Sequence, residues 1–500
     1  MRKILIGITL FFLAWSVHFG QWTPVVAVSE IDAKSSRWGQ CTIAPDGVVH
    51  IVWEEDDIGF RDIFYRNYDG DSFSSIRNLT ANAPNGRVQR ERPYIDCNAK
   101  GKIAVIYQEL GSEVWMAVYD PAADDPRWEL ERVSTPGDGG GEPCITVDYD
   151  GNIYAVWYSE SAGISYTRCK INGTWEDTKR MSSGARSTKV GIASGREQGD
   201  WVYVIWREKQ GNGQYKIKYS RRKSTSDWSS DEFVNFGNYE ESQTHPHITV
   251  GPDKMARVTY GNLAEGSSYQ IRVVVIDEDR QIYRESVTPP NLQHYPRVAV
   301  DPDNNVYIAV QVGPGDRGTG VIVTDNSADN TPGEGVWSTP FLFPGGGQKV
   351  PGISADPYDG NIAIVYDAAH AGSTEKEIWL STLKPVEVKY FDPPVAASCE
   401  IAVSAAMREA VTSYTLTWEK NPNNTEKFLS GYNIYVKEGH QDWQIFKFVD
   451  KSEVESDEKT YQKTYSSGTD FTTGGANVKR QFGIKTVSTW GQESDLKIID

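Results

Sequence analysis

One spacing recurs between residues 47 and 366 and constrains the fold more than any other feature. A turn residue is followed six positions later by a large apolar, usually aromatic, residue that closes a strand. The pairs are Gly47/Trp53, Gly101/Tyr107, Gly151/Trp157, Asp200/Trp206, Lys254/Tyr260, Asn304/Val310 and Gly360/Tyr366. A constant offset within each unit and a variable length between units is typical of repeated supersecondary units joined by surface loops.

Each unit contains four short β patterns, which the third unit shows most clearly. Its strands are expected at Pro143–Val147, Asn152–Trp157, Ile164–Arg168 and Trp175–Met181, with a tight Asp-Gly turn at residues 148–151. Seven four-stranded units of about 50 residues predict an all-β fold, a seven-bladed β-propeller.

The N-terminal segment of the repeat region matches a strand that the last unit lacks. Six units begin their fourth strand with an aromatic residue: Phe73, Trp128, Trp175, Trp228, Tyr283 and Trp337. The seventh has none, but Trp22 lies in a segment, residues 20–28, that resembles the one around Trp337. We therefore expect the chain near residues 20–29 to supply the outer strand of the last blade and to close the ring.

The first residues predict export. Met1-Arg2-Lys3 precedes an apolar run from Ile4 to Trp15, which is typical of a secretory signal peptide ending near residue 19. We expect a secreted or extracellular protein, with the periplasm as the alternative, and no membrane span in the mature chain. A net charge of −17 argues against nucleic acid and anionic membranes as partners. The five Cys lack the paired spacing of a zinc site, and the sequence predicts neither a metal nor a cofactor.

A second domain is expected at residues 385–500, because the period ends after Lys384-Pro385. Alternating strand patterns follow at Tyr414–Trp418, Gly431–Val436, Lys459–Thr464 and Gln481–Ser488. About 110 residues of this pattern predict a β-sandwich. Trp418, the run Gly431–Tyr435 and the late run Phe482–Ser488 resemble fibronectin type III domains, which implies a spacer or interaction module.

The repeat itself, Pro-x-Ile-x-Val-x-x-x-Gly-Asn-Ile-Tyr-x-Val-Trp in the third unit, resembles the BNR-type repeats of sialidase-like propeller proteins over residues 20–383. The sialidase Asp-box, Ser-x-Asp-x-Gly-x-Thr-Trp, is in none of the units, and the Phe-Arg-Ile-Pro signature is absent. The resemblance therefore implies the fold without implying sialidase activity.

Propeller geometry predicts where a site would lie. Loops that enter strand one and leave strand two converge on one face, around the central channel, whereas the Asp-Gly turns lie on the opposite face and are expected to be structural. The residues that enter strand one are Gln40, Arg92, Glu142, Lys189, His245, His294 and Lys349. Those in or after strand two include Glu54, Glu109, Arg207, Tyr260 and Asp367. From these sets we take as ligand-binding candidates Glu54, Arg92, Glu109, Glu142, Arg207, His245, Tyr260, His294, Lys349 and Asp367.

Mixed charge with aromatic rings suits carbohydrate recognition. The leading hypothesis is a secreted binding or adhesion protein that recognises glycans or cell-surface polymers. The chain carries no reactive Ser-His-Asp elbow, metal-ligand spacing or phosphate-binding loop, which favours binding over catalysis.

Two alternatives remain open. One is a carbohydrate-active enzyme. A glycoside hydrolase would use two carboxylates, drawn from Glu54, Glu109, Glu142, Glu208 and Asp367. A polysaccharide lyase would need a base beside a cation, drawn from His245, Tyr260 and His294 with Arg92, Arg207 or Lys349. The other alternative is a protein-interaction scaffold.

Overall fold

The structure is a computed structural model. It describes residues 22–32, 34–57, 59–109, 113–123, 125–135, 139–159, 162–182, 187–223, 226–234, 242–263, 269–278, 280–287, 292–312, 318–324, 341–344, 350–356, 358–369, 373–384, 392–405, 410–421, 424, 429–438, 442–453, 455–457, 460–466, 480–488 and 493–499. The expected signal peptide lies outside these residues. Within them, no helix combines the length and the hydropathy needed to cross a membrane.

The first half of the repeat region folds as successive antiparallel sheets whose strands pair in chain order. The first sheet contains β2 (Ser36–Ile43), β3 (Val49–Asp57), β4 (Phe60–Tyr68) and β5 (Arg77–Asn78). The second contains β6 (Arg90–Cys97), β7 (Ile103–Glu109), β8 (Glu113–Tyr119) and β9 (Trp128–Arg132). The third contains β10 (Cys144–Val147), β11 (Ile153–Ser159), β12 (Ile164–Ile171), β13 (Thr174–Trp175) and β14 (Lys179–Arg180). The expected single strand at 175–181 is thus two short ones, which both pair with β12.

The second half repeats this arrangement. The fourth sheet contains β15 (Ser187–Ser194), β16 (Val202–Lys209), β17 (Tyr215–Arg222) and β18 (Glu232–Phe233). The fifth contains β19 (Ser242–Val250), β20 (Ala256–Leu263), β21 (Tyr269–Asp277) and β22 (Arg280–Val287). The sixth contains β23 (Leu292–Val300), β24 (Val306–Val312), β25 (Thr319–Thr324) and β26 (Phe341–Phe343). The last contains β27 (Gly352–Ala355), β28 (Ile362–Ala369), β29 (Lys376–Thr382) and β1 (Val26–Ala27).

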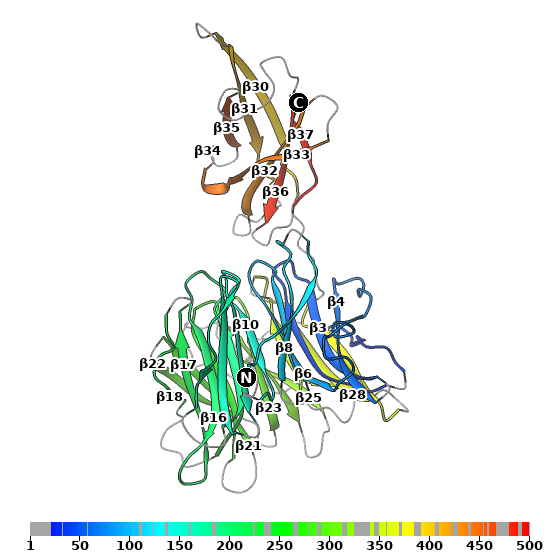
Figure 1. Cartoon of the computed structure of the whole chain (residues 1–500), viewed down its shortest axis with the longest axis vertical. Helices are drawn as coiled ribbons and strands as arrows, with labels where there is room; N and C mark the ends of the chain where they lie inside the picture. Colours follow the sequence, from blue (N-terminus) through cyan, green and yellow to red (C-terminus); the bar gives the residue numbers. More distant parts are fainter. Residues whose placement is uncertain are drawn as a thin grey trace, which may run out of the picture.

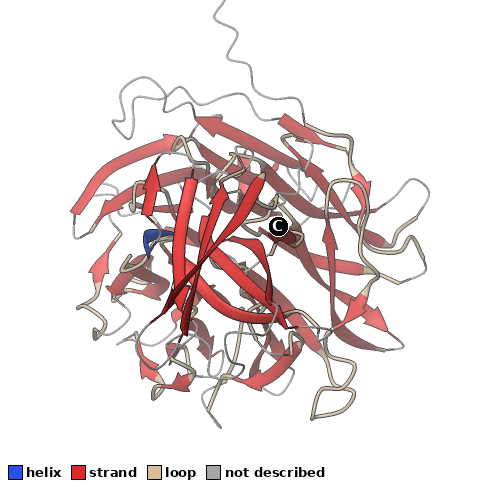
Figure 2. Ribbon diagram, turned by 90° about the horizontal axis from the view of Figure 1, so that it is seen from above, coloured by secondary structure: helices blue, strands red, loops and turns tan. Residues whose placement is uncertain are grey.

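The first strands of these sheets form a closed ring. Each contacts the next, in the order β2, β6, β10, β15, β19, β23 and β27, and β27 contacts β2 again. Figure 1 shows the result, with blue β3 beside yellow β28, and Figure 2 shows the strands arranged around the ring. Sheets that meet through their first strands around a common axis have the arrangement of a β-propeller.

The N-terminal strand closes the ring, as the sequence predicts. Strand β1 pairs antiparallel with β29, with Val26 opposite Leu380 and Ala27 opposite Trp379. The pairing extends on both sides, because the Thr23 amide donates to the Thr382 carbonyl at 2.8 Å and the Val28 amide continues the ladder. The outer edge of the last sheet is therefore covered by the chain itself.

The recurring turn residue has a backbone reason. Gly47, Gly101, Gly151 and Gly360 have φ between 75° and 88°, in the left-handed region that glycine adopts most easily. Neighbouring side chains hold these turns. Asp148, for example, accepts hydrogen bonds from the Asn152 amide and the Tyr154 hydroxyl, each at 2.9 Å. These contacts agree with the structural role expected for such turns.

The C-terminal region contains two further sheets among its described residues. The first has the order β30-β31-β35-β34, and the second β33-β32-β36-β37. Their bounds are β30 (Ala396–Ala405), β31 (Ala410–Glu419), β32 (Leu429–Glu438), β33 (Gln444–Asp450), β34 (Glu455–Asp457), β35 (Thr460–Ser466), β36 (Arg480–Ser488) and β37 (Lys497–Ile499), with one 3₁₀ turn, η2 (Lys451–Glu453). Trp418, Tyr432, Ile434 and Ile484 belong to the core of this region.

Candidate functional site

A repeated backbone distortion lies where the chain enters the ring. Six residues other than glycine adopt positive φ at this level: Trp38 (55°), Arg92 (55°), Glu142 (41°), Lys189 (54°), His245 (48°) and Tyr295 (61°). We call these six residues the mouth cluster. In β2, β6, β15, β19 and β23 the register to the second strand shifts at this point, which is a β-bulge or a related irregularity.

This conformation costs about 1–2 kcal/mol for each residue with a Cβ atom. It is repeated in six sheets, on residues that include no glycine. Non-glycine residues persist in this region only where the surrounding structure holds them there, and such strain gathers at functional sites. Proline follows the distorted residue in four cases, at Pro93, Pro143, Pro246 and Pro296.

The mouth cluster lines one small cavity of about 50 Å³. All six of its residues contribute, together with Gln40, Tyr94 and Arg297. A space of this size holds one ligand substituent rather than a whole sugar ring, because one liquid water occupies about 30 Å³. The six first-strand segments therefore bring their polar and aromatic side chains to a common recess.

The side chains of the mouth cluster contact one another in two groups. Glu142 pairs with Arg92, whose Nη1 lies 3.2 Å from Glu142 Oε1, and it also pairs with Lys189. The Arg92 guanidinium lies 5.7 Å from the centre of the Trp38 ring. On the other side, the rings of His245 and Tyr295 have centroids 4.1 Å apart.

Positive charge is in excess at this recess. Arg92, Lys189 and Arg297 line it together with the single carboxylate of Glu142. The pKa of Lys189 is lowered by burial and by the nearby Arg92 and Arg297, although Glu142 opposes the shift. The Nε atom of Arg297 is buried and has no hydrogen-bond acceptor. A guanidinium whose buried Nε–H has no acceptor among the described residues favours an anionic ligand group that would complete its hydrogen bonds.

Glu54 lies next to the recess but is not exposed to it. The side chain is buried, and its Oε2 accepts a hydrogen bond from the Arg92 amide at 2.8 Å. Burial raises the pKa of Glu54 to about 7, against the opposing effects of this hydrogen bond and of Arg61. Glu54 thus stabilises the distorted backbone of Arg92 through this hydrogen bond.

Most predicted candidates on the second strands are buried within their own sheets. Glu109 pairs with Arg90 at 3.1 Å and Asp367 with Lys376 at 2.9 Å. Tyr260 is fully buried in the core. Arg207 donates from Nε to the Gln243 carbonyl, and its guanidinium lies 3.7 Å from the centre of the Tyr215 ring. The cavity lining includes none of Glu54, Glu109, Arg207, Tyr260 and Asp367.

Two further carboxylates of the second strands, Glu208 and Glu55, are bound by a local pattern that the sequence analysis missed. The indole N–H of Trp206 donates to Glu208 at 3.0 Å, two residues further along the same strand. Trp53 makes the same contact with Glu55, also at 3.0 Å. An acid two positions after the closing tryptophan is therefore bound to that tryptophan rather than exposed at the mouth.

Of the other candidates, Arg92, Glu142 and His245 lie in the mouth cluster. Lys349 and the side chain of His294 lie outside the described residues. The recess is also lined by Trp38, Tyr295 and Arg297, which the ligand-binding candidates from the sequence do not include. The signal that could have found Tyr295 is the proline after it, because Pro296 stands 14 residues before its closing residue, as Pro93, Pro143 and Pro246 do.

The two neighbouring histidines, His245 and His247, contact different partners. His245 contacts Tyr295, whereas His247 Nε2 lies 2.9 Å from the Tyr94 hydroxyl. Among the residues that the structure describes, no group of three or more His, Cys, Asp or Glu side chains is arranged to hold a metal ion.

Comparison with known proteins adds structural neighbours only. No family model matches the chain, and no curated protein matches it. The chain is similar to a solved structure of a protein of unknown function from Dyadobacter fermentans, with 11% identity and a TM-score of 0.46, over 73% of this chain and 99% of that one. It is also similar to the BP39L lectin from Burkholderia pseudomallei, with 11% identity and a TM-score of 0.45, over 71% and 99%.

A third neighbour is the α-L-arabinanase of Penicillium chrysogenum, with 13% identity and a TM-score of 0.43, over 59% of this chain and 93% of that one. These similarities assign no chemistry to the site of this chain.

Proposed function

We propose that this chain is a secreted protein that binds acidic glycans at the mouth cluster. The observation that carries the proposal is the repeated left-handed backbone, which turns six polar or aromatic side chains toward one recess. Aromatic rings such as Trp38 and Tyr295 suit the apolar faces of sugars, and the charged side chains suit their substituents.

The charge balance supports an acidic ligand. Three cations and one carboxylate line the recess, on a chain whose net charge is −17. A volume of about 50 Å³ suits a carboxylate or sulfate group, with the rest of the glycan lying over the mouth cluster. Arg92 and Arg297 can each donate two parallel hydrogen bonds to such a group, which a lysine cannot do.

The proposed architecture is a signal peptide over residues 1–19, a seven-bladed propeller over 20–384 and a fibronectin type III-like domain over 385–500. The two sheet orders of the C-terminal region support the last part, because four and four antiparallel strands suit such a sandwich. We assign this domain the role of a spacer between the propeller and the surface to which the protein is anchored or bound.

The test is an array of acidic and neutral polysaccharides, read with protein that begins at Gly20. Saturable binding to uronate-containing or sulfated polymers, weakened by salt, is expected. Lys189→Gln and Arg92→Gln should each reduce the affinity at least tenfold. Lys447→Gln, which removes an exposed charge from β33, is the matched control and should bind as the wild type does.

The same samples distinguish the alternatives. Mass spectrometry that finds new reducing ends or unsaturated uronates would make the protein an enzyme. Equal binding by the wild type and both mouth variants would show that the glycan binds at a different site. No binding to any polymer would favour the protein-interaction scaffold.

A further inference from the structure

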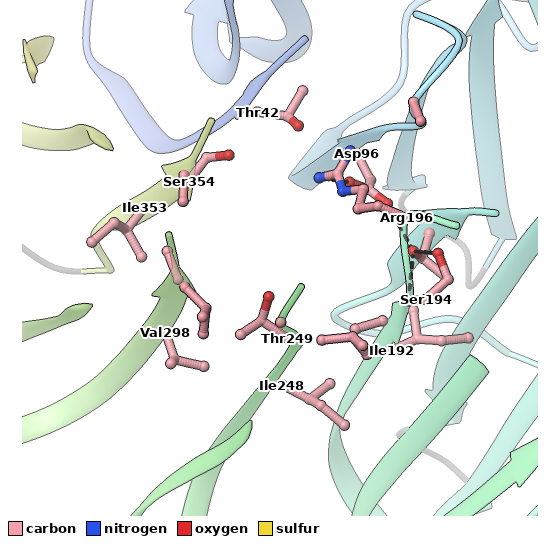
Figure 3. A pocket seen from close by; sticks show the side chains of 18 of the residues that line it. Thr42, Asp96, Ile192, Ser194, Arg196, Ile248, Thr249, Val298, Ile353 and Ser354 are labelled. Carbon is pink, nitrogen blue, oxygen red and sulfur yellow. Dashed lines mark hydrogen bonds and ion pairs between the residues drawn. The ribbon is translucent and has the colours of Figure 1, made fainter. Parts of the chain in front are cut away.

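The channel of the ring contains a second, larger cavity that the mouth cluster does not line. Its volume is about 320 Å³, and all the first strands around the ring contribute to it. Figure 3 shows side chains from these strands around the open space. The rim lies at the turns between the first and second strands, where Tyr149, Pro252 and Tyr358 contribute. This is the face opposite the one expected to carry a site.

The strand register divides the cavity into two rings. One ring, which we call the apolar ring, has a residue from each first strand at the same register: Cys41, Ile95, Ile145, Ile192, Ile248, Val298 and Ile353. The next register position, which we call the polar ring, has five polar residues and two alanines: Thr42, Asp96, Thr146, Ala193, Thr249, Ala299 and Ser354. An apolar zone adjoining a zone of hydroxyl groups suits an amphiphilic molecule.

The mouth side of the cavity is bounded by a hydrogen-bonded pair. Tyr94 lines both cavities, and its hydroxyl lies 2.9 Å from His247 Nε2. His247 Nδ1 accepts a hydrogen bond from the Val298 amide, so the neutral ring carries its proton on Nε2 and donates it to Tyr94. Burial and Arg297 hold the pKa of His247 well below its ordinary value. The Tyr94–His247 pair therefore stays in one state at physiological pH and separates the channel cavity from the mouth recess.

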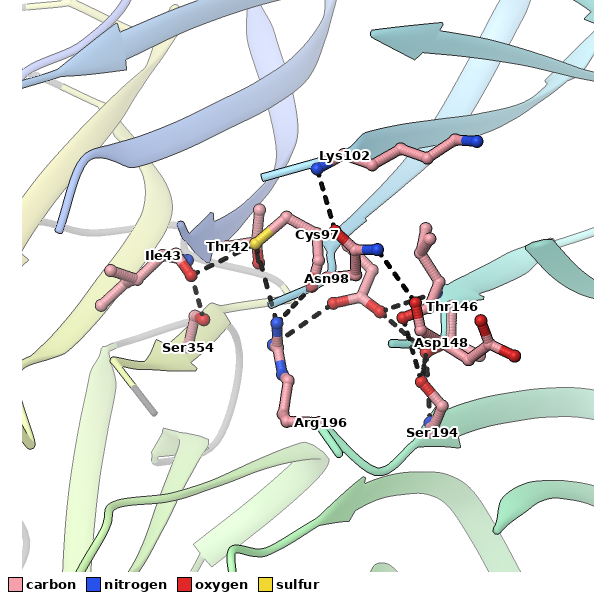
Figure 4. Close-up of polar contacts among 12 residues, drawn as sticks. Thr42, Ile43, Cys97, Asn98, Lys102, Thr146, Asp148, Ser194, Arg196 and Ser354 are labelled. Carbon is pink, nitrogen blue, oxygen red and sulfur yellow. Dashed lines mark hydrogen bonds and ion pairs between the residues drawn. The ribbon is translucent and has the colours of Figure 1, made fainter. Parts of the chain in front are cut away.

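Most hydroxyl groups of the polar ring bind neighbouring sheets, as Figure 4 shows. Thr146 donates to Asp96 at 2.7 Å, and Ser354 accepts from the Ile43 amide at 3.2 Å. Thr249 differs, because its hydroxyl has no hydrogen-bond partner among the described residues although it lines the cavity. A ligand hydroxyl group could complete its hydrogen bonding there.

The charged side chains at this end are paired with one another and leave a net charge of −1. Arg196 reaches across to β6, where Nη1 donates to the Cys97 carbonyl and Nη2 lies 3.5 Å from Asp96 Oδ1. At the rim, Lys254 pairs with Glu197 at 2.9 Å and Asp200 at 3.3 Å. Two cations thus face three carboxylates, and each of them has a partner. Neither a carboxylate nor an ammonium ligand finds an unpaired opposite charge here.

We infer that the channel cavity binds a small, uncharged cyclic compound that carries a hydroxyl group. Its ring lies in the apolar ring, and its hydroxyl group meets Thr249. The size is sufficient, since an engineered apolar cavity of about 150 Å³ already holds benzene. This site is independent of the glycan proposed for the mouth.

Ligand-observed NMR with phenol, benzene, benzoate and benzylamine tests the inference on the whole chain. Phenol is expected to bind saturably and more tightly than the two ions. Thr249→Phe replaces the hydroxyl group by a ring that projects into the ligand's place and should reduce phenol binding at least tenfold, while binding of acidic polymers at the mouth is unchanged. Thr174→Phe, at an exposed position on β13, is the matched control and should leave phenol binding intact.

If Thr249→Phe does not fold, Thr249→Val still tests the inference. It removes only the hydroxyl group, so phenol binding should fall threefold or more while benzene binding stays the same. The inference is overturned if phenol does not bind saturably, if either ion binds more tightly, or if Thr249→Phe binds phenol as the wild type does. An equal loss of phenol and benzene in Thr249→Val would remove the role of its hydroxyl group. None of these results depends on whether a glycan binds.

Discussion

Replacing Glu54 by glutamine should stabilise the protein at high pH and leave its stability unchanged at low pH. Glu54 is 1% exposed, and burial raises the pKa of its carboxyl from 4.5 to about 7. Because the folded-state pKa lies above the unfolded value, the native state binds more protons between these two values. Wild-type stability therefore falls as the pH rises through this window.

The magnitude follows from the shift. Each pKa unit corresponds to 1.36 kcal/mol, so the charged carboxylate costs about 3 kcal/mol above pH 7 relative to a neutral group. Glutamine is neutral at every pH and keeps an oxygen that can accept the Arg92 amide hydrogen bond. Glu54→Gln should therefore gain up to about 3 kcal/mol at pH 8 and nothing near pH 4.5.

Urea unfolding followed by tryptophan fluorescence at the two pH values measures the difference. Glu129→Gln is the matched control, because the Glu129 side chain is 71% exposed on β9, and it should have no effect at either pH. A Glu54→Gln variant that is less stable than the wild type at pH 8 would refute the reasoning. It would mean that the ion pair with Arg61, at 3.6 Å, outweighs the cost of burial.

Three further outcomes are expected. Protein that begins at Ser29 lacks β1, which leaves the edge of β29 exposed. Its urea midpoint should therefore lie well below that of protein beginning at Gly20. Equal midpoints would show that ring closure contributes little to stability. Tyr94→Phe leaves the buried Nε2–H of His247 without an acceptor and should cost about 1–3 kcal/mol in the same assay, whereas an unchanged midpoint would refute the proposed proton position. Under native conditions a thiol reagent should modify Cys399 first, since the other four cysteines are buried; early modification of a propeller cysteine in mass-spectrometric peptide maps would contradict this.

The architecture was largely readable from the sequence because its determinants are local. A left-handed turn residue, a two-residue side-chain period and a buried closing aromatic residue each depend on a few neighbouring positions. Even ring closure could be predicted from a short segment, because the residues around Trp22 resemble those around Trp337. In the structure, β1 pairs with β29, as this resemblance predicts.

The site was readable only in part, because a bulge changes which side chain faces the axis. The sequence analysis selected His294, but it is Tyr295 that adopts the left-handed conformation and lines the recess. Likewise Trp38 holds that conformation, two residues before Gln40. One inserted residue shifts the period-two alternation, and no polarity pattern reports such a shift.

By itself, the sequence determined the repeat, the strands and the segment that closes the ring. Only the tertiary structure decided which polar groups meet. Arg92 lies on β6, Glu142 just before β10 and Lys189 on β15, and their ion pairs exist because these successive first strands pack against one another. The same holds for Tyr94 and His247, which are 153 residues apart and separate the mouth from the channel. Contacts between repeats depend on the relative placement of whole sheets, and residue spacing within one repeat carries no information about that placement.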